Sequence, residues 1–213
     1  MPLTMPNLPT IPEQAEQLIK LGVHEIAGLS AAELRGAVSE VNAEDTLLVL
    51  HPDRVPASSL VHLLEHDGKR GFVVTDMADI DEFGPIEPVT VPAGPAYVIS
   101  KLDRGDHLAN WSPDEALPAI VADGRTPLTV TEAIHWLLQR PDVLERNHCF
   151  MAIGSRLRKA DGALDARTPA VWISNGTGRD GRANRNAPKI GWCWAGNRHT
   201  WLGFASAARR GPV

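Results

Sequence analysis

The chain of 213 residues lacks the features that mark secreted and membrane proteins. Its two cysteines, Cys149 and Cys193, can form at most one disulfide, and a reducing cytosol disfavours even that. Its longest apolar runs, such as residues 47–50 and 72–74, are far too short to span a bilayer. Its first residues show no basic segment followed by an apolar stretch, as signal peptides do. We therefore expect a cytoplasmic protein with no membrane partner.

Standard catalytic and cofactor-binding motifs are also lacking. Gly176 and Gly178 follow a predicted strand but open no helix, so they form no dinucleotide-binding or phosphate-binding loop. Ser155 does not lie in the Gly-x-Ser-x-Gly turn of hydrolases. No compact zinc pattern is formed by His148, Cys149, Cys193 and His199. We expect no metal site and no cofactor, and we interpret both cysteines as inert core thiols.

Charge is divided unevenly along the chain. Residues 1–150 hold 10 Lys and Arg against 23 Asp and Glu, whereas residues 151–213 hold 11 basic and only 3 acidic residues. Three interpretations are open. The basic end can pair with the acidic body, it can hold a phosphate, sulfate or carboxylate, or it can bind nucleic acid. The net charge of −5 and the lack of a recognition motif make nucleic acid the weakest of the three.

Hydrophobic periodicity and helix-capping signals predict a mixed structure. Helices are expected at residues 13–21, 30–41, 56–66, 112–122, 129–139 and 141–147, three of them opened by the caps Ser30, Ser112 and Thr129. Strands are expected at residues 46–50, 71–75, 96–100, 170–174 and 190–194. This order favours an α+β (or α/β) fold, in which helices flank a small mixed sheet next to a basic, Trp-rich carboxyl-terminal subregion.

The sequence shows no sharp linker between domains. Residues 1–12 contain four prolines and are predicted to form a flexible arm. Residues 13–213 are then expected to form a single globular domain. Within it, the polar and glycine-rich residues 175–187 predict a mobile surface loop.

A Trp-rich block near the carboxyl terminus is the strongest candidate for a functional site. Four of the six tryptophans lie between residues 172 and 201. Side chains alternate along a strand, so Trp192 and Trp194 point to the same face. An aromatic core patch would explain part of this block, but buried Asn197 and His199 would be costly without polar partners. We therefore predict that Trp192, Trp194, Asn197, His199 and Trp201 line a site.

Charged and polar residues elsewhere are weaker candidates. Asp103 follows an apolar strand and is our candidate general base together with His199, while a solvated turn with an Asp–Arg pair is the simpler interpretation of Asp103 and Arg104. Arg156 follows a Gly-Ser turn that can present backbone amides to an anion. We assign substrate binding to these further residues: Arg104, Asn147, Arg156, Lys189 and Arg198. Asn147 is equally explained as a left-handed helix terminator.

The chain resembles an actinobacterial family described only as a domain of unknown function. The resemblance covers residues 94–97, 103–105, 125–129, 147–150, 154–156, 169–174, 188–197 and 199–203. Its most specific part is the motif GWCWAGN-x-HTWLG at residues 191–203. The resemblance implies a link to natural-product pathways, including formation of the aziridine ring of azinomycin-type compounds.

Together these features predict a small cytoplasmic enzyme, or catalytic subunit, acting on a small anionic substrate derived from an amino acid. A cofactor-independent reaction that fits is intramolecular displacement of sulfate or phosphate to close an aziridine ring, because cations can stabilise the leaving anion. The alternative is a non-catalytic binding or stabilising subunit of a heteromeric complex, with a protein partner or an acidic carrier protein. Nucleic acid is a third and weaker expectation.

Overall fold

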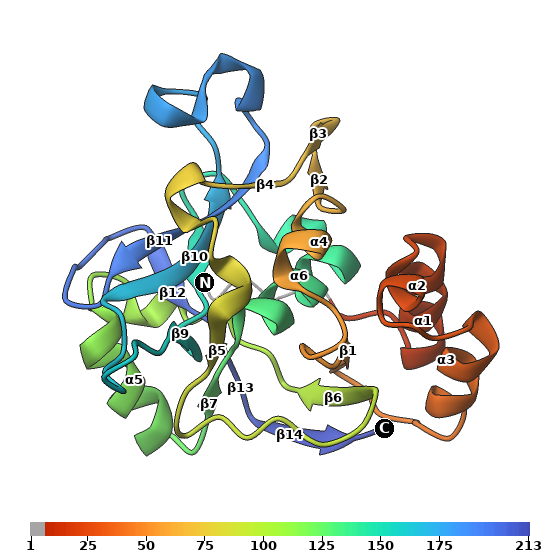
Figure 1. Cartoon of the computed structure of the whole chain (residues 1–213). Helices are drawn as coiled ribbons and strands as arrows, with labels where there is room; N and C mark the ends of the chain where they lie inside the picture. Colours follow the sequence, from red (N-terminus) through yellow and green to blue (C-terminus); the bar gives the residue numbers. More distant parts are fainter. Residues whose placement is uncertain (1–6) are drawn as a thin grey trace.

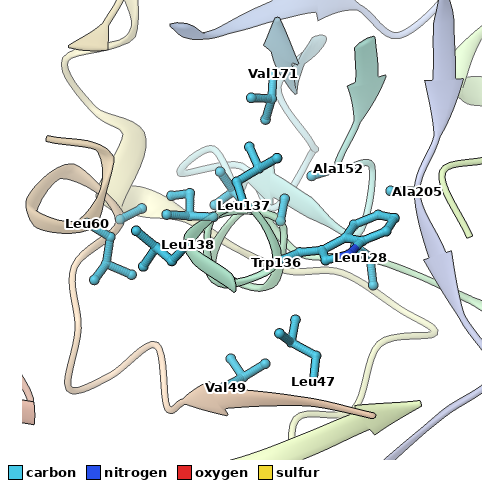
Figure 2. Close-up of a cluster of buried hydrophobic side chains, with 14 of the residues drawn as sticks. Leu47, Val49, Leu60, Leu128, Trp136, Leu137, Leu138, Ala152, Val171 and Ala205 are labelled. Atoms are coloured by element: carbon cyan, nitrogen blue, oxygen red, sulfur yellow. The ribbon is translucent and has the colours of Figure 1, made fainter. Parts of the chain in front are cut away.

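The computed structural model describes residues 7–213, and one helix runs through its centre (Figure 1). All ten residues of this helix, α6 (Val130–Gln139), are buried. The capping box predicted at its start is present, since the Thr129 hydroxyl accepts the Glu132 amide at 3.3 Å. Figure 2 shows Leu47 and Val49 on one side of the helix and Val171 on the opposite side. The helix is therefore enclosed between two sheets.

The smaller sheet is antiparallel and contains the last strand of the chain. Its strands are β1 (Thr46–Leu50), β6 (Ala96–Ser100) and β14 (Arg209–Pro212), in the order β1-β6-β14. On the outer edge of β1, the buried Gln14 amide donates to Thr46 O at 2.7 Å, and its Oε1 accepts the Leu48 amide at 2.8 Å. One side chain thus takes the place of a neighbouring strand.

The larger sheet is mixed and has five strands in the order β12-β8-β10-β11-β4. These are β12 (Leu202–Phe204), β8 (Cys149–Met151), β10 (Arg167–Ile173), β11 (Pro188–Trp194) and β4 (Phe72–Val73). The central strand β10 is antiparallel to both neighbours, whereas the outer pairs are parallel. Phe150 of β8 packs on Trp136 of α6, with ring centroids 5.5 Å apart.

Shorter elements surround these layers. The two-stranded pairs are β13 (Ser206–Ala207) with β7 (Thr126–Pro127), β2 (Glu65–His66) with β3 (Lys69–Arg70), and β5 (Phe83–Pro85) with β9 (Ser155–Leu157). The remaining α-helices are α1 (Ile11–Lys20), α2 (Val23–Ile26), α3 (Ala31–Val38), α4 (Ala57–Val61) and α5 (Pro113–Ala122). Single 3₁₀ turns are η1 (Thr75–Met77), η2 (Ile80–Glu82), η3 (Asp106–Leu108), η4 (Pro141–Val143), η5 (Gly178–Asp180) and η6 (Arg182–Asn184). The α+β prediction and the single domain are confirmed.

Several predicted elements have different limits in the structure. The helix expected over 56–66 ends at Val61, because Asp67 and Gly68 take positive φ angles and turn the chain into the β2–β3 hairpin. The helix expected over 141–147 is only the turn η4. Helix α1 begins at Ile11, inside the predicted arm, because Thr10 forms a capping box with Glu13. Residues 1–6 of that arm lie outside the described residues.

A buried ion pair ties the last strand to the central helix. The Glu132 side chain is fully buried, the Arg210 side chain is 4% exposed, and Arg210 Nε lies 2.6 Å from Glu132 Oε1. The Tyr97 hydroxyl donates to the same carboxylate oxygen at 2.9 Å. Burial beside this carboxylate raises the pKa of Tyr97 well above its ordinary value. These partners satisfy a charge that would otherwise be very costly in the core.

His135, one turn further along α6, is buried in its neutral form. Its Nε2 accepts the Leu50 amide at 3.2 Å, and its Nδ1 lies 2.9 Å from Thr131 O, to which it donates. Burial lowers the pKa of His135 from 6.5 to about 4. The imidazole therefore joins α6 to β1 only while it is uncharged.

The Glu132–Arg210 pair gives a stability prediction. We expect Arg210→Gln to lower the free energy of unfolding by about 3–5 kcal/mol, because it leaves a buried carboxylate without its cation. Urea denaturation measures the change. The control is Arg209→Gln, which alters the adjacent exposed arginine and should cost less than about 0.5 kcal/mol. Equal effects of the two variants would contradict the assignment.

His135 gives a prediction for pH. The unfolded chain binds a proton on this imidazole near pH 6.5, whereas the folded chain does so only near pH 4, so protons favour the unfolded state in this window. The stabilisation is complete above pH 6.5 and falls by about 3 kcal/mol as the pH drops to 4. His135→Gln should remove this slope from urea titrations, whereas His107→Gln, at an exposed position, should retain it.

Candidate functional site

Three exposed tryptophans adjoin one loop, residues 195–201, which connects β11 to β12. Trp194, which is 47% exposed, directly precedes the loop, and Trp201, which is 38% exposed, is its last residue. Trp111, 42% exposed, lies in the segment whose Asn110 amide donates to His199 O at 2.9 Å. We call Trp111, Trp194, Trp201, His199 and the half-buried Trp172 and Trp192 the tryptophan surface. Exposed indoles are uncommon and mark binding surfaces when they gather.

The structure separates the predicted tryptophans into two groups. Trp192 and Trp194 share one face of β11, as alternation predicts, and their rings meet edge to face at 4.4 Å. Trp172 lies opposite Lys189 in the β10–β11 ladder, and alternation places this pair on the other face of the sheet. The indoles therefore surround the loop from two sides and do not form one pocket wall.

The second group combines aromatic rings with a neutralised cation. The Trp172 and Trp201 rings are perpendicular at 6.4 Å, and the His199 ring lies 5.5 Å from Trp201. Lys189 Nζ lies 4.7 Å from the centre of the Trp172 ring and 2.6 Å from Asp180 Oδ1. Its charge is thus already balanced by the carboxylate and the indole.

Arg156 has a different environment from the other predicted cations. It is half-buried on β9, and its Nε donates to the backbone oxygen of Asp165 at 2.8 Å. Within residues 7–213 no carboxylate lies close enough to form an ion pair with it. Burial lowers the pKa of this guanidinium below its ordinary value, while the charges of Asp114 and Asp165 oppose that shift. The cation is bound to a neutral carbonyl only.

Backbone hydrogen bonds connect Arg156 to the tryptophan surface. Arg156 donates to Asp165 O, and the next carbonyl, of Ala166, accepts the Ala195 amide at 2.8 Å. Ala195 O in turn accepts the Asp114 amide at 3.0 Å, at the start of α5. Ala195 follows Trp194 directly, so the guanidinium, this indole and the start of α5 belong to one neighbourhood.

Two predicted site residues have structural partners, and a third lies in an exposed turn. Arg104 is buried, chelates the Asp106 carboxylate through Nε and Nη2 at 2.6–3.0 Å, and donates to Val143 O at 2.8 Å. Asp103 Oδ1 accepts the Gly105 amide at 2.7 Å in a tight turn. Asn147 has a φ of 65° and is exposed in the turn before β8. Their roles in substrate binding or proton transfer remain predictions.

The two remaining candidates lie on the loop itself. Arg198 is exposed and forms an ion pair with Glu115 of α5. Asn197 is exposed. Its backbone amide donates to Trp194 O at 3.0 Å, and this bond closes the turn after β11. The loop is therefore held to α5 by both a side-chain contact and the Asp114–Ala195 bond.

Ion pairs account for much of the uneven charge. Four contacts join the basic end to the acidic body: Arg167–Asp79, Arg179–Asp76, Arg198–Glu115 and Arg210–Glu132. The first of these, at 2.6 Å, holds the pKa of Asp79 below its ordinary value. This supports internal complementarity, the simplest of the three interpretations of the charge pattern.

Comparison with protein families identifies a relationship over almost the entire chain. Residues 17–213 match the model of a family of unknown function, DUF5701. The chain belongs to this family. No curated protein and no solved structure gives a match. The resemblance found in the sequence is thus confirmed at the level of this DUF5701 family.

Burial raises the pKa of both Cys149 and Cys193 to about 11, so neither is a thiolate at neutral pH. Among residues 7–213, no three His, Cys, Asp or Glu side chains are grouped to hold a metal ion. No helix in this part of the chain has the length and hydropathy needed to cross a membrane.

Sequence reasoning missed Trp111 and Asp180. Trp111 immediately precedes the cap Ser112 and so lies outside the predicted helix, and this position held the only available signal. Asp180 is one of only three acidic residues after residue 150. Its carboxylate joins Lys189 at 2.6 Å to the Ser174 hydroxyl at 2.7 Å. It therefore anchors the loop 175–187 to the sheet.

Asp180 gives a prediction for this loop. We expect Asp180→Asn to speed trypsin cleavage after Arg179, Arg182 and Arg185, because the charged anchor is lost while the core is untouched. The measurement is the cleavage rate followed by mass spectrometry. Asp123→Asn, at an exposed position after α5, is the control. If cleavage at these sites is unchanged, Asp180 does not order the loop.

Proposed function

We propose that the chain binds a small anionic ligand at the tryptophan surface and that Arg156 holds the anion. This proposal rests on Arg156, which forms no direct ion pair within residues 7–213 although the charges of Asp114 and Asp165 act on it from further away. Lys189, Arg198 and Arg104 each contact a carboxylate, whereas the half-buried Arg156 contacts only a carbonyl. Burying a cation without an anion is costly, and a bound anion would remove that cost.

The neighbouring groups suit a ligand that combines an anion with a flat or apolar part. A guanidinium offers paired N–H donors that match carboxylate, sulfate and phosphate. Its Nε and Nη2 are engaged by Asp165 O, while Nη1 has no partner among the described residues. Trp194, joined to this site through Ala195, supplies an exposed indole face. We therefore infer a substrate of the size of an amino-acid derivative.

In its more specific form, we propose that the chain is an enzyme, or a catalytic subunit, of natural-product metabolism in actinobacteria. In aziridine closure, the nitrogen lone pair of an amine forms a bond to carbon while the carbon–oxygen bond breaks, and sulfate or phosphate leaves with that electron pair. Arg156 would stabilise the leaving anion. His199, whose half-buried ring lies beside Trp201 in the other group of rings, is the proposed acceptor of the amine proton, so the substrate would have to extend across the loop from Arg156. The carboxylate of Asp103 already accepts a backbone amide.

The second candidate function is a non-catalytic subunit. It is favoured by the exposure of Trp111, Trp194 and Trp201, since tryptophans often dominate the binding energy of protein interfaces. In this case a protein partner would cover the three indoles together. An acidic carrier protein would also bind the cation of Arg156 through its negative charge.

The test is binding of two probe anions, inorganic sulfate and benzenesulfonate, followed by NMR chemical shifts of the full chain. We expect Arg156→Gln to weaken both about tenfold or more, because a charge-assisted hydrogen bond is lost. Trp194→Ala should weaken only the aromatic anion. The matched control is Arg158→Gln, which changes an exposed arginine two residues further along the chain.

Three results would decide against the proposal or a part of it. If Arg156→Gln and Arg158→Gln bind both anions equally, Arg156 is not the anion-holding residue. If neither anion binds, and Trp194→Ala with Trp201→Ala abolishes co-purification of one protein partner, the chain is a binding subunit. Full turnover by His199→Gln would remove the proposed proton acceptor.

A further inference from the structure

Asp114 carries a carboxylate that has no bonding partner in the fold. It is the second residue of α5 and is exposed. Ser112 and Glu115 form the capping box at this helix start, and Glu115 also pairs with Arg198. The Asp114 side chain, in contrast, makes no hydrogen bond and no ion pair with any residue between 7 and 213. Neither the cap nor the loop 195–201 therefore requires this carboxylate.

Main-chain hydrogen bonds hold Asp114 near Trp194 and Arg156. The Asp114 amide donates to Ala195 O at 3.0 Å, and the Ala195 amide donates at 2.8 Å to the carbonyl of the residue after Asp165. Arg156 Nε donates to the carbonyl of Asp165 itself at 2.8 Å. The start of α5 therefore has a fixed position relative to the guanidinium and to Trp194, which directly precedes Ala195.

The Asp114 carboxylate acts on the Arg156 guanidinium without contacting it. The two side chains form no ion pair. Burial lowers the pKa of Arg156, and the negative charge of Asp114 opposes this shift more strongly than that of Asp165. Asp165 is adjacent, because its carbonyl binds the guanidinium, and Coulomb interactions weaken with distance. The Asp114 carboxylate therefore lies close to Arg156 but beyond hydrogen-bond distance.

Arg156 and Asp114 are the unpaired charges of this neighbourhood. The Asp165 carboxylate pairs with Arg167 at 3.1 Å, so Asp114 is the free carboxylate of the two. A ligand that carries only negative charge is attracted by Arg156 and repelled by Asp114. A ligand that carries both charges is attracted by both side chains.

The geometry points to a zwitterionic ligand, an α-amino acid or a close derivative of one. Its anionic group binds Arg156, its ammonium group binds Asp114, and its side chain lies on the exposed indole of Trp194. The two charged groups of an α-amino acid are attached to one carbon, which suits opposite charges that are close together without being in contact. This inference rests on the proposed function, because Arg156 holds the anion in both, and it makes Asp114 the residue that selects the amine.

A zwitterionic ligand also bears on the ring-closing reaction. Its amine would lie beside Asp114, on the Arg156 side of the loop, and not beside His199. The Asp114 carboxylate would then take the ammonium proton, which frees the nitrogen lone pair to attack carbon. Asp114 thereby replaces His199 as the proton acceptor.

An acidic residue at a helix start also has a simpler explanation. A negative charge there stabilises the helix through its dipole. That role predicts a small loss of stability for Asp114→Asn and the same change in the binding of every ligand. Selection of an amine predicts different effects on ligands with and without one, so binding separates the two interpretations.

The experiment is a titration with L-phenylalanine and 3-phenylpropanoate at neutral pH, followed by NMR chemical shifts of the full ¹⁵N-labelled chain. The two probes share the ring and the carboxylate, and only the first has an ammonium group. We expect the parent chain to bind L-phenylalanine about tenfold more tightly. Asp114→Asn should remove this preference, with 3-phenylpropanoate binding as well as before or better. Asp123→Asn, at the other end of α5, should retain it.

The outcomes separate this inference from the proposed function. Equal affinity of the parent chain for the two probes, or equal weakening of both by Asp114→Asn, would overturn the role of Asp114 and leave the anion site at Arg156 intact. Arg156→Gln should weaken both probes, because it removes the group that holds the carboxylate. If it weakens neither, or if neither probe binds, the proposed function fails as well.

Discussion

The buried contact between Glu132 and Arg210 is the constraint on which the rest of the structure depends. It places a carboxylate on the most enclosed helix and its cation on the last strand of the chain. The sheet β1-β6-β14 cannot close until β14 is present, and β14 carries this arginine. Tyr97 on β6 donates to the same carboxylate, so side chains from α6, β6 and β14 meet between helix and sheet. Folding of α6 and docking of the carboxyl terminus are therefore coupled.

Ion pairs between the acidic and basic parts of the chain also form at the surface, and Arg156 differs from these arginines because it has no such pair. Acidic residues of the first 150 neutralise Arg167, Arg179 and Arg198. Five of the eleven basic side chains in residues 151–213 thus form ion pairs within the fold, and these five imply no ligand. Arg156 is half-buried and lacks such a partner. Unsatisfied groups of this kind are the places where natural proteins depart from good packing for the sake of a ligand.

The sequence predicted elements with strong local signals and missed those that depend on distant partners. The caps Ser30, Ser112 and Thr129 and the strands over 46–50 and 96–100 were correct, because their signals lie within a few residues. The three-residue strands β8, β9 and β12 carry no periodicity of their own, and they form only against β10, β5 and β8, respectively. For the candidate site, the sequence predicted Trp194, Trp201 and Arg156 as site residues, and their roles remain predictions. The carboxylates that neutralise Lys189 and Arg198 could not be predicted, since each pairing is fixed by tertiary structure.

The central claim is that the Arg156 guanidinium binds an anion next to the tryptophan surface. Crystals grown with selenate, which resembles sulfate, would test it most directly through the anomalous signal of selenium. The account predicts a selenium peak within hydrogen-bond distance of the Arg156 guanidinium, on the side of Trp194. Selenate bound only to the arginines of the 175–187 loop, with Arg156 unoccupied, would contradict it.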